Sequence, residues 1–237
     1  MIDLSGQRVL CVGGSSGIGR ATAQLALQLG ADVTLASRSP AKLAAAREAL
    51  GGGARTAVLD VTDDAAVEAF FAEGTPWDHV VVTGSDVRIA PVRELPLAQA
   101  LASFDSKFWG FYRVARSARL RPGGSLGVVA GFLATRPAPG RALMGAINGA
   151  LESLVRGLAL ELKPVRVNAV SPAMVRTEMW AGLPEAARAE AFARAAAAYP
   201  AGCVGEPADI ARQLLLLAAT PYATGVVVTL DGGASIC

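Results

Sequence analysis

The sequence contains little histidine and little cysteine. His79 is the only histidine among 237 residues, so the chain cannot form a metal site with several histidine ligands. The three cysteines, Cys11, Cys203 and Cys237, form no CxxC pair and no local ligand spacing, so we expect no bound metal. Their odd number is typical of free thiols in a reducing compartment and predicts a cytoplasmic protein. His79 directly precedes an apolar segment, and we expect a structural role for it.

Long apolar runs and blocks of positive charge are also absent. Although 52% of the residues are hydrophobic, charged residues interrupt each apolar run before it reaches the roughly 20 residues that a membrane-spanning helix needs. The N-terminal segment has no basic region followed by a long apolar stretch, so we expect no export signal. The net charge is only +2 and is spread along the chain, which predicts no nucleic-acid partner. We therefore expect a soluble protein without a membrane partner.

Strand-like and helix-like segments alternate along the chain. Short apolar runs rich in β-branched residues occur at 8–12, 32–36, 55–59, 79–83, 125–130, 165–170 and 226–230. Stretches rich in Ala, Leu, Arg and Glu, long enough for helices, separate most of them. Because the strands are continuously apolar, we expect a parallel sheet that is covered on both faces. The sequence predicts one α/β domain over residues 1–237, with a Rossmann-type doubly wound sheet of about seven strands.

A glycine-rich turn follows the first strand and opens directly into a helix. Its spacing is GxxxGxG, and a dinucleotide would contact Gly13, Ser15, Ser16, Gly17, Ile18 and Gly19. Glycine lets the backbone approach a pyrophosphate, and the positive end of the helix binds its charge. A purely structural turn is the alternative, but the position between a strand and a helix favours a dinucleotide site.

The end of the second strand indicates which dinucleotide binds. Proteins of this fold that prefer NAD commonly have an acidic residue there, which accepts from the ribose 2′-hydroxyl. This chain has Ser37 and Arg38 instead. A guanidinium favours a 2′-phosphate through charge-assisted hydrogen bonds, so the sequence predicts NADP(H). Arg38 as an ordinary solvated arginine is the alternative.

Motifs of one family recur along the whole chain. They are GGSSGIG at 13–19, LDVTD at 59–63, RVNAVSPAMVRTEM at 166–179, GEPADIA at 205–211 and TGVVVTLDGG at 224–233. With these motifs, the sequence resembles the short-chain dehydrogenase/reductase family. The resemblance implies adenine contacts at Asp60 and Val61, and contacts to the carboxamide and pyrophosphate at Val175 and Thr177. It also implies that Thr83, Gly84 and Pro172 lie against the cofactor.

The sequence departs from the family at the positions of its proton-transfer residues. Met144 and Asn148 stand where the family has tyrosine and lysine, and Gly131 stands where it has serine. None of the three tyrosines is followed by a lysine four residues later, so a shifted alignment does not restore the pair. A thioether carries no proton to donate. Losing a positioned general acid typically costs on the order of 10²- to 10⁴-fold in rate.

Lysine and asparagine look exchanged between two helices. The family has asparagine on the earlier helix and lysine on the later one, whereas this chain has Lys107 earlier and Asn148 later. We expect Lys107 to reach towards the nicotinamide ribose or a nearby water, with Asn148 as a hydrogen-bonding partner beside it. The alternative is a solvated Lys107 at a helix edge.

Other polar residues near the predicted site are further candidates. Ser85 and Asp86 follow the fourth strand, at the sheet edge where open α/β sheets bind ligands, and Asp86 is a candidate acid. A role of Asp86 in capping the next segment is the alternative. Arg136 and Arg141 precede the helix of Met144. They would polarise a carbonyl or hold an anionic substrate, or they would lie at the surface.

The segment at 179–200 resembles the family's substrate lid. Met179, Trp180, Leu183 and Phe192 would line a pocket for a largely apolar substrate, or they would pack on the core. The helix expected at 142–162 is apolar around most of its circumference, which predicts burial between subunits of a homodimer or homotetramer.

These features together predict an NADP(H)-dependent oxidoreductase that acts on a carbonyl or alcohol of a small, largely apolar molecule. Lys107, Asn148 and Asp86 are its candidate catalytic residues. The sequence leaves two alternatives open: an inactive NADPH-binding sensor or scaffold, and a non-redox isomerase or cyclase that uses the same pocket.

Overall fold

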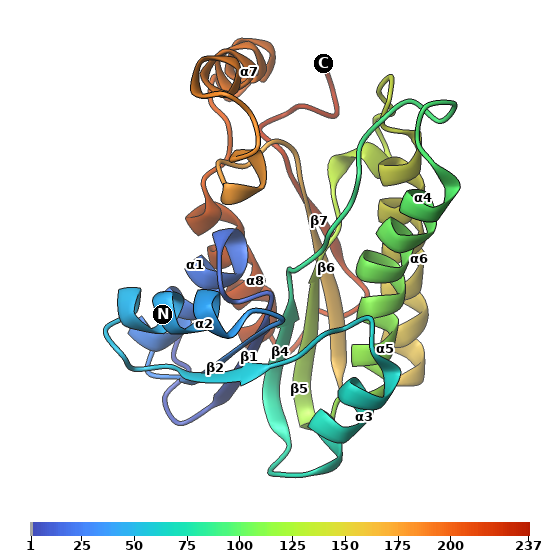
Figure 1. Ribbon diagram of the computed structural model, residues 1–237. Helices are drawn as coiled ribbons and strands as arrows, with labels where there is room; N and C mark the ends of the chain where they lie inside the picture. Colours follow the sequence, from blue (N-terminus) through green and yellow to red (C-terminus); the bar gives the residue numbers. More distant parts are fainter. Residues whose placement is uncertain (1) are drawn as a thin grey trace.

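Seven parallel strands form the central sheet of the protein, whose computed structural model describes residues 2–237 (Figure 1). The strands are β1 (Arg8–Val12), β2 (Asp32–Ser37), β3 (Arg55–Val58), β4 (Trp77–Val82), β5 (Leu120–Val129), β6 (Arg166–Pro172) and β7 (Val227–Leu230). Their order across the sheet is β3-β2-β1-β4-β5-β6-β7. The predicted α/β class and the parallel, doubly wound sheet are confirmed. Met1 of the expected domain lies outside the described residues.

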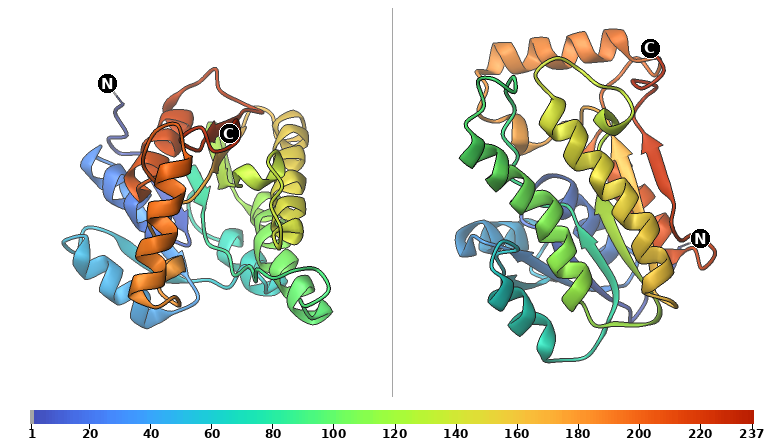
Figure 2. Two further views of the ribbon diagram at one scale, coloured as in Figure 1. Left: turned by 90° about the horizontal axis from the view of Figure 1, so that it is seen from above. Right: turned by 90° about the vertical axis from the view of Figure 1, so that its right-hand side faces the viewer.

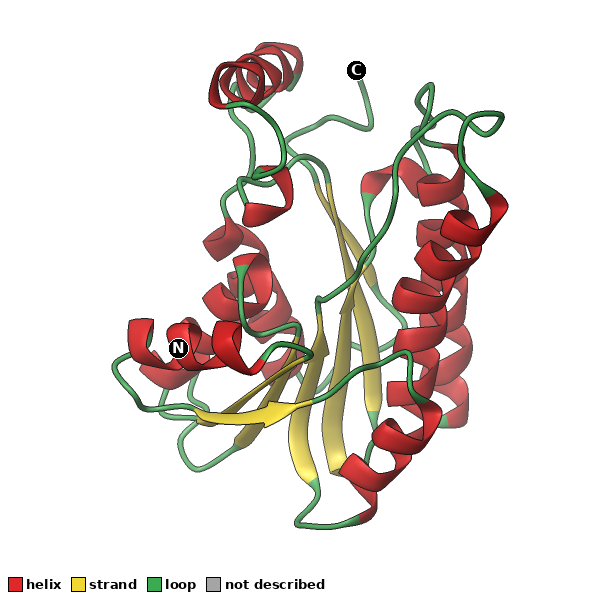
Figure 3. Cartoon of the chain, in the orientation of Figure 1, coloured by secondary structure: helices red, strands yellow, loops and turns green. Residues whose placement is uncertain are grey.

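Helices cover both faces of the sheet (Figures 1 and 3). One layer contains α3 (Asp64–Ala72), α4 (Leu97–Phe104), α5 (Gly110–Ser117) and α6 (Ala142–Glu161), and the other contains α1 (Gly17–Gln28), α2 (Pro40–Ala49) and α8 (Pro207–Ala219). Side chains of β1 alternate between the layers, because Leu10 and Val12 join the core beneath α3, α5 and α6, whereas Val9 and Cys11 join the core beneath α1 and α2. Burial on both sides explains why the strand is continuously apolar.

The strand order reverses between β1 and β4. From β1 the chain winds outward through β2 to β3, and it then returns to the opposite side of β1 to begin β4. Open α/β sheets bind ligands at such a point, outside the carboxyl ends of the strands. Helix α7 (Glu185–Ala198) lies across this end of the molecule (Figure 2). In the described part of the chain, no helix is long and apolar enough to cross a membrane.

Candidate cofactor and active site

A cavity of about 250 Å³ opens at the carboxyl ends of β1, β2, β3 and β4. Its walls include the predicted residues Gly13, Ser15, Ser16, Ser37, Arg38, Asp60, Val61, Gly84, Ser85 and Asp86. These residues come from four loops that are far apart in the sequence, and the reversal of strand order brings them together. His79 lies near the opposite end of β4, where its ring nitrogens contact Ser125 and Gln7.

The first loop packs tightly against the loop after β4. A Cβ atom at Gly13 would lie 2.3 Å from the backbone nitrogen of Gly84, and Gly13 has a φ of +82°, so only glycine fits there. A Cβ atom at Gly19 would lie 2.3 Å from the carbonyl oxygen of Gly13. Thr83 supports the loop, because its hydroxyl donates to the carbonyl oxygen of Val12 at 3.2 Å. The two glycines therefore let the first loop and the start of α1 pack directly against the loop after β4.

A carboxylate occupies the N-terminus of α1. Glu178 Oε2 accepts from the backbone nitrogen of Gly17 at 2.9 Å, and its Oε1 accepts from Arg20 at 2.8 Å. Thr177 lies against the same turn, 3.2 Å from where a Cβ atom at Gly17 would be. The N-terminus of a helix stabilises negative groups, so this end of α1 can hold an anion. The sequence did not indicate Glu178, although it directly follows the predicted contact Thr177.

The end of β2 presents polar groups to the cavity. Ser37 Oγ is buried and has no hydrogen-bond partner among residues 2–237. Because buried hydroxyls are nearly always hydrogen-bonded, this atom points to a polar group of a bound ligand. Arg38, Ser39 and Lys42 line the same wall. A hydroxyl beside two cationic side chains suits a phosphorylated ribose. The sequence did not indicate Ser39 or Lys42, although both follow Arg38 within one helical turn.

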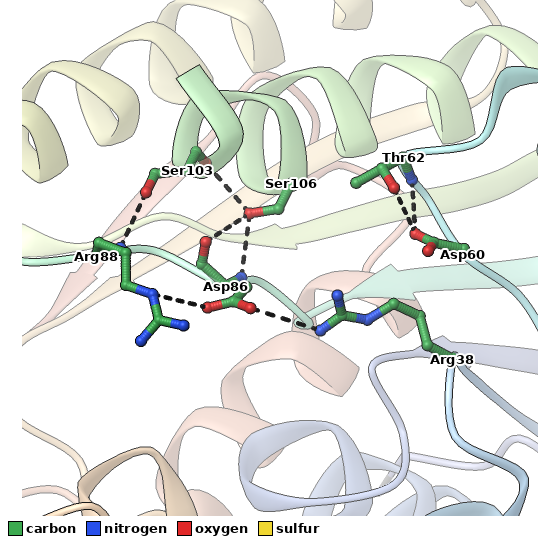
Figure 4. Close-up of polar contacts among 7 residues, drawn as sticks. All are labelled: Arg38, Asp60, Thr62, Asp86, Arg88, Ser103 and Ser106. Carbon is green, nitrogen blue, oxygen red and sulfur yellow. Dashed lines mark hydrogen bonds and ion pairs between the residues drawn. The ribbon is translucent and has the colours of Figure 1, made fainter. Parts of the chain in front are cut away.

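The Asp86 carboxylate lies between two arginines (Figure 4). Its oxygens are 3.9 Å from nitrogens of Arg38 and Arg88, and about half of its side chain is exposed. Ser106 fixes the backbone of the loop, because its hydroxyl donates to the Asp86 carbonyl oxygen at 2.9 Å and accepts from the Asp86 nitrogen at 3.1 Å. The carboxylate therefore contacts the two guanidinium groups, one of which lines the cavity.

Asp60 and Val61, the two residues expected to contact the adenine, have contacts of their own within the protein. Asp60 Oδ1 accepts from the backbone nitrogen of Thr62 at 3.0 Å and from its hydroxyl at 2.8 Å (Figure 4). Val61 packs under the start of α5, where a Cβ atom at Gly110 would lie 2.7 Å from its Cγ2. These contacts hold the loop after β3 against the cavity.

Lys107 and Asn148 are in direct contact. Lys107 belongs to a π-helical turn (η1, Asp105–Trp109) between α4 and α5, and such turns are frequent at functional sites. Its Nζ donates to Asn148 Oδ1 at 2.7 Å and to the carbonyl oxygen of Ala130 at 3.0 Å. Burial lowers the pKa of Lys107 to about 8. Lys107 is therefore hydrogen-bonded to Asn148 and is not free at a helix edge, while its approach to the nicotinamide ribose stays a prediction.

The other residues expected near Lys107 and Asn148 include a methionine and a glycine, whose side chains have no proton to donate, and two arginines. Met144 lies one helical turn before Asn148 on α6 and is half-buried. A Cβ atom at Gly131 would lie 2.6 Å from Asn148 Nδ2. Arg136 is exposed, whereas Arg141 directly precedes α6 and is half-buried.

The lid candidates divide into two groups. Trp180 donates from Nε1 to the carbonyl oxygen of Val175 at 3.0 Å, and its ring packs edge to face against Phe192. Met179 and Leu183 are exposed. Pro172 is buried at the end of β6, seven residues before the lid segment. The two aromatic residues thus anchor the segment, while the other two lie exposed on it.

Known proteins resemble this chain over nearly its full length. Residues 12–235 match the family model described as enoyl-(acyl carrier protein) reductase. The chain is 32% identical to the short-chain dehydrogenase/reductase ATR9 of Stachybotrys chlorohalonatus, with 99% of each chain covered. A solved structure of a small-chain dehydrogenase in complex with NADPH is 31% identical, with a TM-score of 0.86, and the match covers 98% of this chain and 100% of that one. The NADPH-bound short chain oxidoreductase of Pseudomonas aeruginosa PAO1, which contains an atypical catalytic center, is 30% identical, with a TM-score of 0.92 and 100% of both chains covered.

Proposed function

Because the chain belongs to the short-chain dehydrogenase/reductase family of oxidoreductases, we propose that it moves hydride between NADP(H) and a carbonyl or alcohol of a small, largely apolar molecule. The observation that carries this proposal is the cavity at the β1–β4 reversal, in which the unpartnered Ser37 hydroxyl lies beside Arg38. NADP(H) is the cofactor, in keeping with the NADPH complexes of its structural neighbours. When bound, it supplies or accepts the hydride.

The residues of the cavity have separable roles in binding. Arg38 and Lys42 would neutralise the 2′-phosphate, while Ser37 hydrogen-bonds to the same ribose. Gly13, Ser15, Ser16, Gly17, Ile18 and Gly19 would hold the pyrophosphate together with Thr177, and Asp60 and Val61 the adenine. Thr83, Gly84, Pro172 and Val175 would lie along the remainder of the dinucleotide.

Proton transfer would rest on a non-standard site. Met144 and Gly131 stand where the family has tyrosine and serine, and neither side chain can donate a proton. Lys107, with a pKa lowered towards neutrality by burial, would be the proton source for the substrate oxygen, and Asn148 its hydrogen-bonding partner. The third candidate, Asp86, contacts Arg38, which supports a role in positioning that arginine. The neighbour from P. aeruginosa shows that a chain of this fold can contain an atypical catalytic center.

We also propose that residues 1–237 form one domain and that the chain assembles into a homodimer or homotetramer in the cytoplasm. The bound partners would be the cofactor and a small-molecule substrate.

Titration of the purified protein with NADPH and with NADH tests the proposal. We expect saturable micromolar NADPH binding and much weaker NADH binding, followed by nicotinamide fluorescence and by the thermal midpoint, because a ligand stabilises the folded state. Arg38→Ala should weaken NADPH binding about tenfold and leave NADH binding unchanged, since hydrogen bonds to charged groups contribute about 1.5–3 kcal/mol.

The matched control is Arg88→Ala. Arg88 lies at the same 3.9 Å from Asp86 but does not line the cavity, so its loss should leave NADPH affinity unchanged. If the protein bound neither NADPH nor NADH, the proposed oxidoreductase function would be contradicted. NADPH binding without consumption by a panel of carbonyl compounds would favour a sensor or scaffold, and product formation without a change in cofactor absorbance would favour an isomerase or cyclase.

A further inference from the structure

The orientation of the Asn148 amide is determined by chemistry. A lysine ammonium has only donors, so the amide atom 2.7 Å from Lys107 Nζ must be the acceptor Oδ1. The amide nitrogen Nδ2 is therefore not the atom that binds Lys107. The Ala130 carbonyl oxygen also accepts from the Lys107 ammonium, at 3.0 Å, and this second hydrogen bond holds the lysine in place beside the amide.

The amide nitrogen is a free donor in a nearly closed place. Asn148 is only 1% exposed, yet no acceptor in residues 2–237 takes a hydrogen bond from Nδ2. In the described chain, the fully buried side-chain atoms without a hydrogen-bond partner are Ser37 Oγ and Arg166 Nε. Asn148 Nδ2 has no partner but is not among them, so part of its surface is still accessible. A nearly buried donor without a protein partner is suited to an acceptor on a ligand.

Gly131 leaves the space in which the amide lies. A Cβ atom there would be 2.6 Å from Nδ2 and 3.3 Å from Cγ of Asn148. The φ of Gly131 is 161°, an extended conformation that any residue adopts, so the backbone does not require glycine. The missing side chain is required by the amide instead. Gly131 follows Ala130, whose carbonyl binds Lys107, so the three residues form one arrangement.

From this geometry we propose that Asn148 Nδ2 donates the hydrogen bond that holds the substrate oxygen, with Lys107 orienting the amide and Gly131 leaving room for it. The inference rests on the proposed function and assigns its substrate contact. In the direction of reduction, hydride supplied by NADPH would add to the carbonyl carbon and the π pair would move to oxygen. That oxygen would take the third proton of the Lys107 ammonium, whose other two are bound by Ala130 and Asn148, and the amine would regain a proton from the solvent. The amide donor binds more strongly as charge develops on the oxygen. The substrate class is thus a compound with an accessible carbonyl oxygen.

Asn148→Asp tests the donor itself. Aspartate keeps the acceptor for Lys107 and the size of the side chain but loses the NH₂ group. Because removing one donor to a developing oxyanion costs about 10²–10³ in kcat, we expect at least a hundredfold lower kcat, with the NADPH dissociation constant within about twofold of wild type. A wild-type kcat in this variant would overturn the inference.

Gly131→Ala tests the arrangement without changing Asn148. The added methyl group should displace the amide and lower kcat about as much as Asn148→Asp does. In an Asn148→Ala background the same substitution should have no further effect on kcat or on the thermal midpoint, because its target is gone. Gly127→Ala is the matched control on β5, where the new Cβ atom would meet only ordinary contacts of 3.7 Å or more. Equal effects of Gly131→Ala in both backgrounds would overturn the inference.

Failure of the proposed function is distinguishable from failure of this inference. A wild-type protein that consumes no NADPH with any carbonyl compound overturns both. A wild-type protein that turns over, with Asn148→Asp equally active, overturns the inference alone. The thermal midpoints of Gly131→Ala and of the double variant give a readout that does not depend on activity.

Discussion

At the scale of single residues, Lys107 is under two opposing influences. Burial favours its neutral form, whereas the oxygens of Ala130 and Asn148 favour the ammonium. Burial is the stronger, and it lowers the pKa of Lys107 from 10.5 to about 8. Near neutral pH the lysine still carries its proton but releases it more readily than an exposed lysine would, as a proton donor to a substrate requires.

The lowered pKa predicts how stability depends on pH. Between about pH 8 and 10.5 the unfolded chain holds a proton on Lys107 that the folded chain has released. The contribution of Lys107 to the free energy of unfolding should therefore rise with pH in this range. In Lys107→Met this rise should be missing. Urea unfolding of both proteins at intervals from pH 7.5 to 10.5 measures the difference.

The comparison with Lys107→Met also controls for other groups that titrate. Burial raises the pKa of Cys11 to about 12, so this thiol acts in the opposite direction, but it does so equally in both proteins. Parallel stability curves for wild type and variant would contradict the burial of Lys107.

At the scale of elements, the C-terminus of α8 depends on a side chain from β6. The guanidinium of Arg166 donates to the carbonyl oxygens of Leu217 at 2.7 Å and Thr220 at 2.9 Å, and also to that of Ala218. The last carbonyls of a helix have no partner within the helix, so this residue satisfies them. We expect Arg166→Met to lower the free energy of unfolding by about 2–3 kcal/mol.

Arg212→Met is the matched control on the same helix. Arg212 is exposed and pairs only with Asp209, so its loss should cost no more than about 0.5 kcal/mol. Urea unfolding measures both variants. Equal costs would show that the Arg166 bonds add nothing to the stability of α8.

A second element-scale contact joins Glu178, directly before the lid segment, to α1. The Glu178 carboxylate and the pyrophosphate of the cofactor would both lie near the N-terminus of α1, where two negative groups repel. In Glu178→Gln the amide oxygen can still accept from Gly17, but the charge is gone. Since a charge at this place contributes about 0.3–1 kcal/mol, the NADPH dissociation constant should fall about two- to fivefold.

The control for Glu178→Gln is Glu190→Gln on α7. It removes the same charge from a residue whose partner, Arg194, lies on the same helix. Fluorescence titration with NADPH should give an unchanged affinity for the control. Weaker binding to Glu178→Gln would mean that the carboxylate assists the cofactor and does not compete with it.

At the scale of the whole molecule, one helical layer carries apolar side chains that the chain itself leaves uncovered. Leu97, Leu101, Trp109 and Tyr112 are all exposed along α4, η1 and α5. The rings of Trp109 and Tyr112 pack against each other, and Leu97 and Leu101 are four residues apart on α4. Exposed apolar side chains that gather on one layer are typical of interaction sites, which supports the proposed homo-oligomer. We expect Leu101→Glu to shift the protein towards monomers in sedimentation velocity, with the dissociation constant raised at least about tenfold.

Val92→Glu is the control for Leu101→Glu. Val92 is 76% exposed but lies in the loop before α4, so the same charge there should leave the assembly unchanged. A wild-type chain that sediments as a monomer at micromolar concentration would refute the proposed assembly.

Local patterns in the sequence were sufficient for the fold. All seven expected segments overlap strands, because runs of β-branched apolar residues favour the extended backbone, even in the edge strands β3 and β7, which contain no buried residue. The glycine-rich turn at 13–19 could also be predicted from the sequence, since glycine at this spacing lets the backbone approach other backbone atoms closely. The absence of a tyrosine followed by a lysine four residues later is also a property of the sequence alone.

Only the tertiary structure decided which distant groups meet. Lys107 and Asn148 are 41 positions apart, and Glu178 and Gly17 are 161 positions apart. Family resemblance suggested that the first pair are neighbours, but no local pattern shows that a side chain at Gly131 would displace the amide. Such contacts depend on how closely packed helices and strands approach one another. That approach is determined by the volumes of side chains throughout the core, which no single segment of the sequence contains.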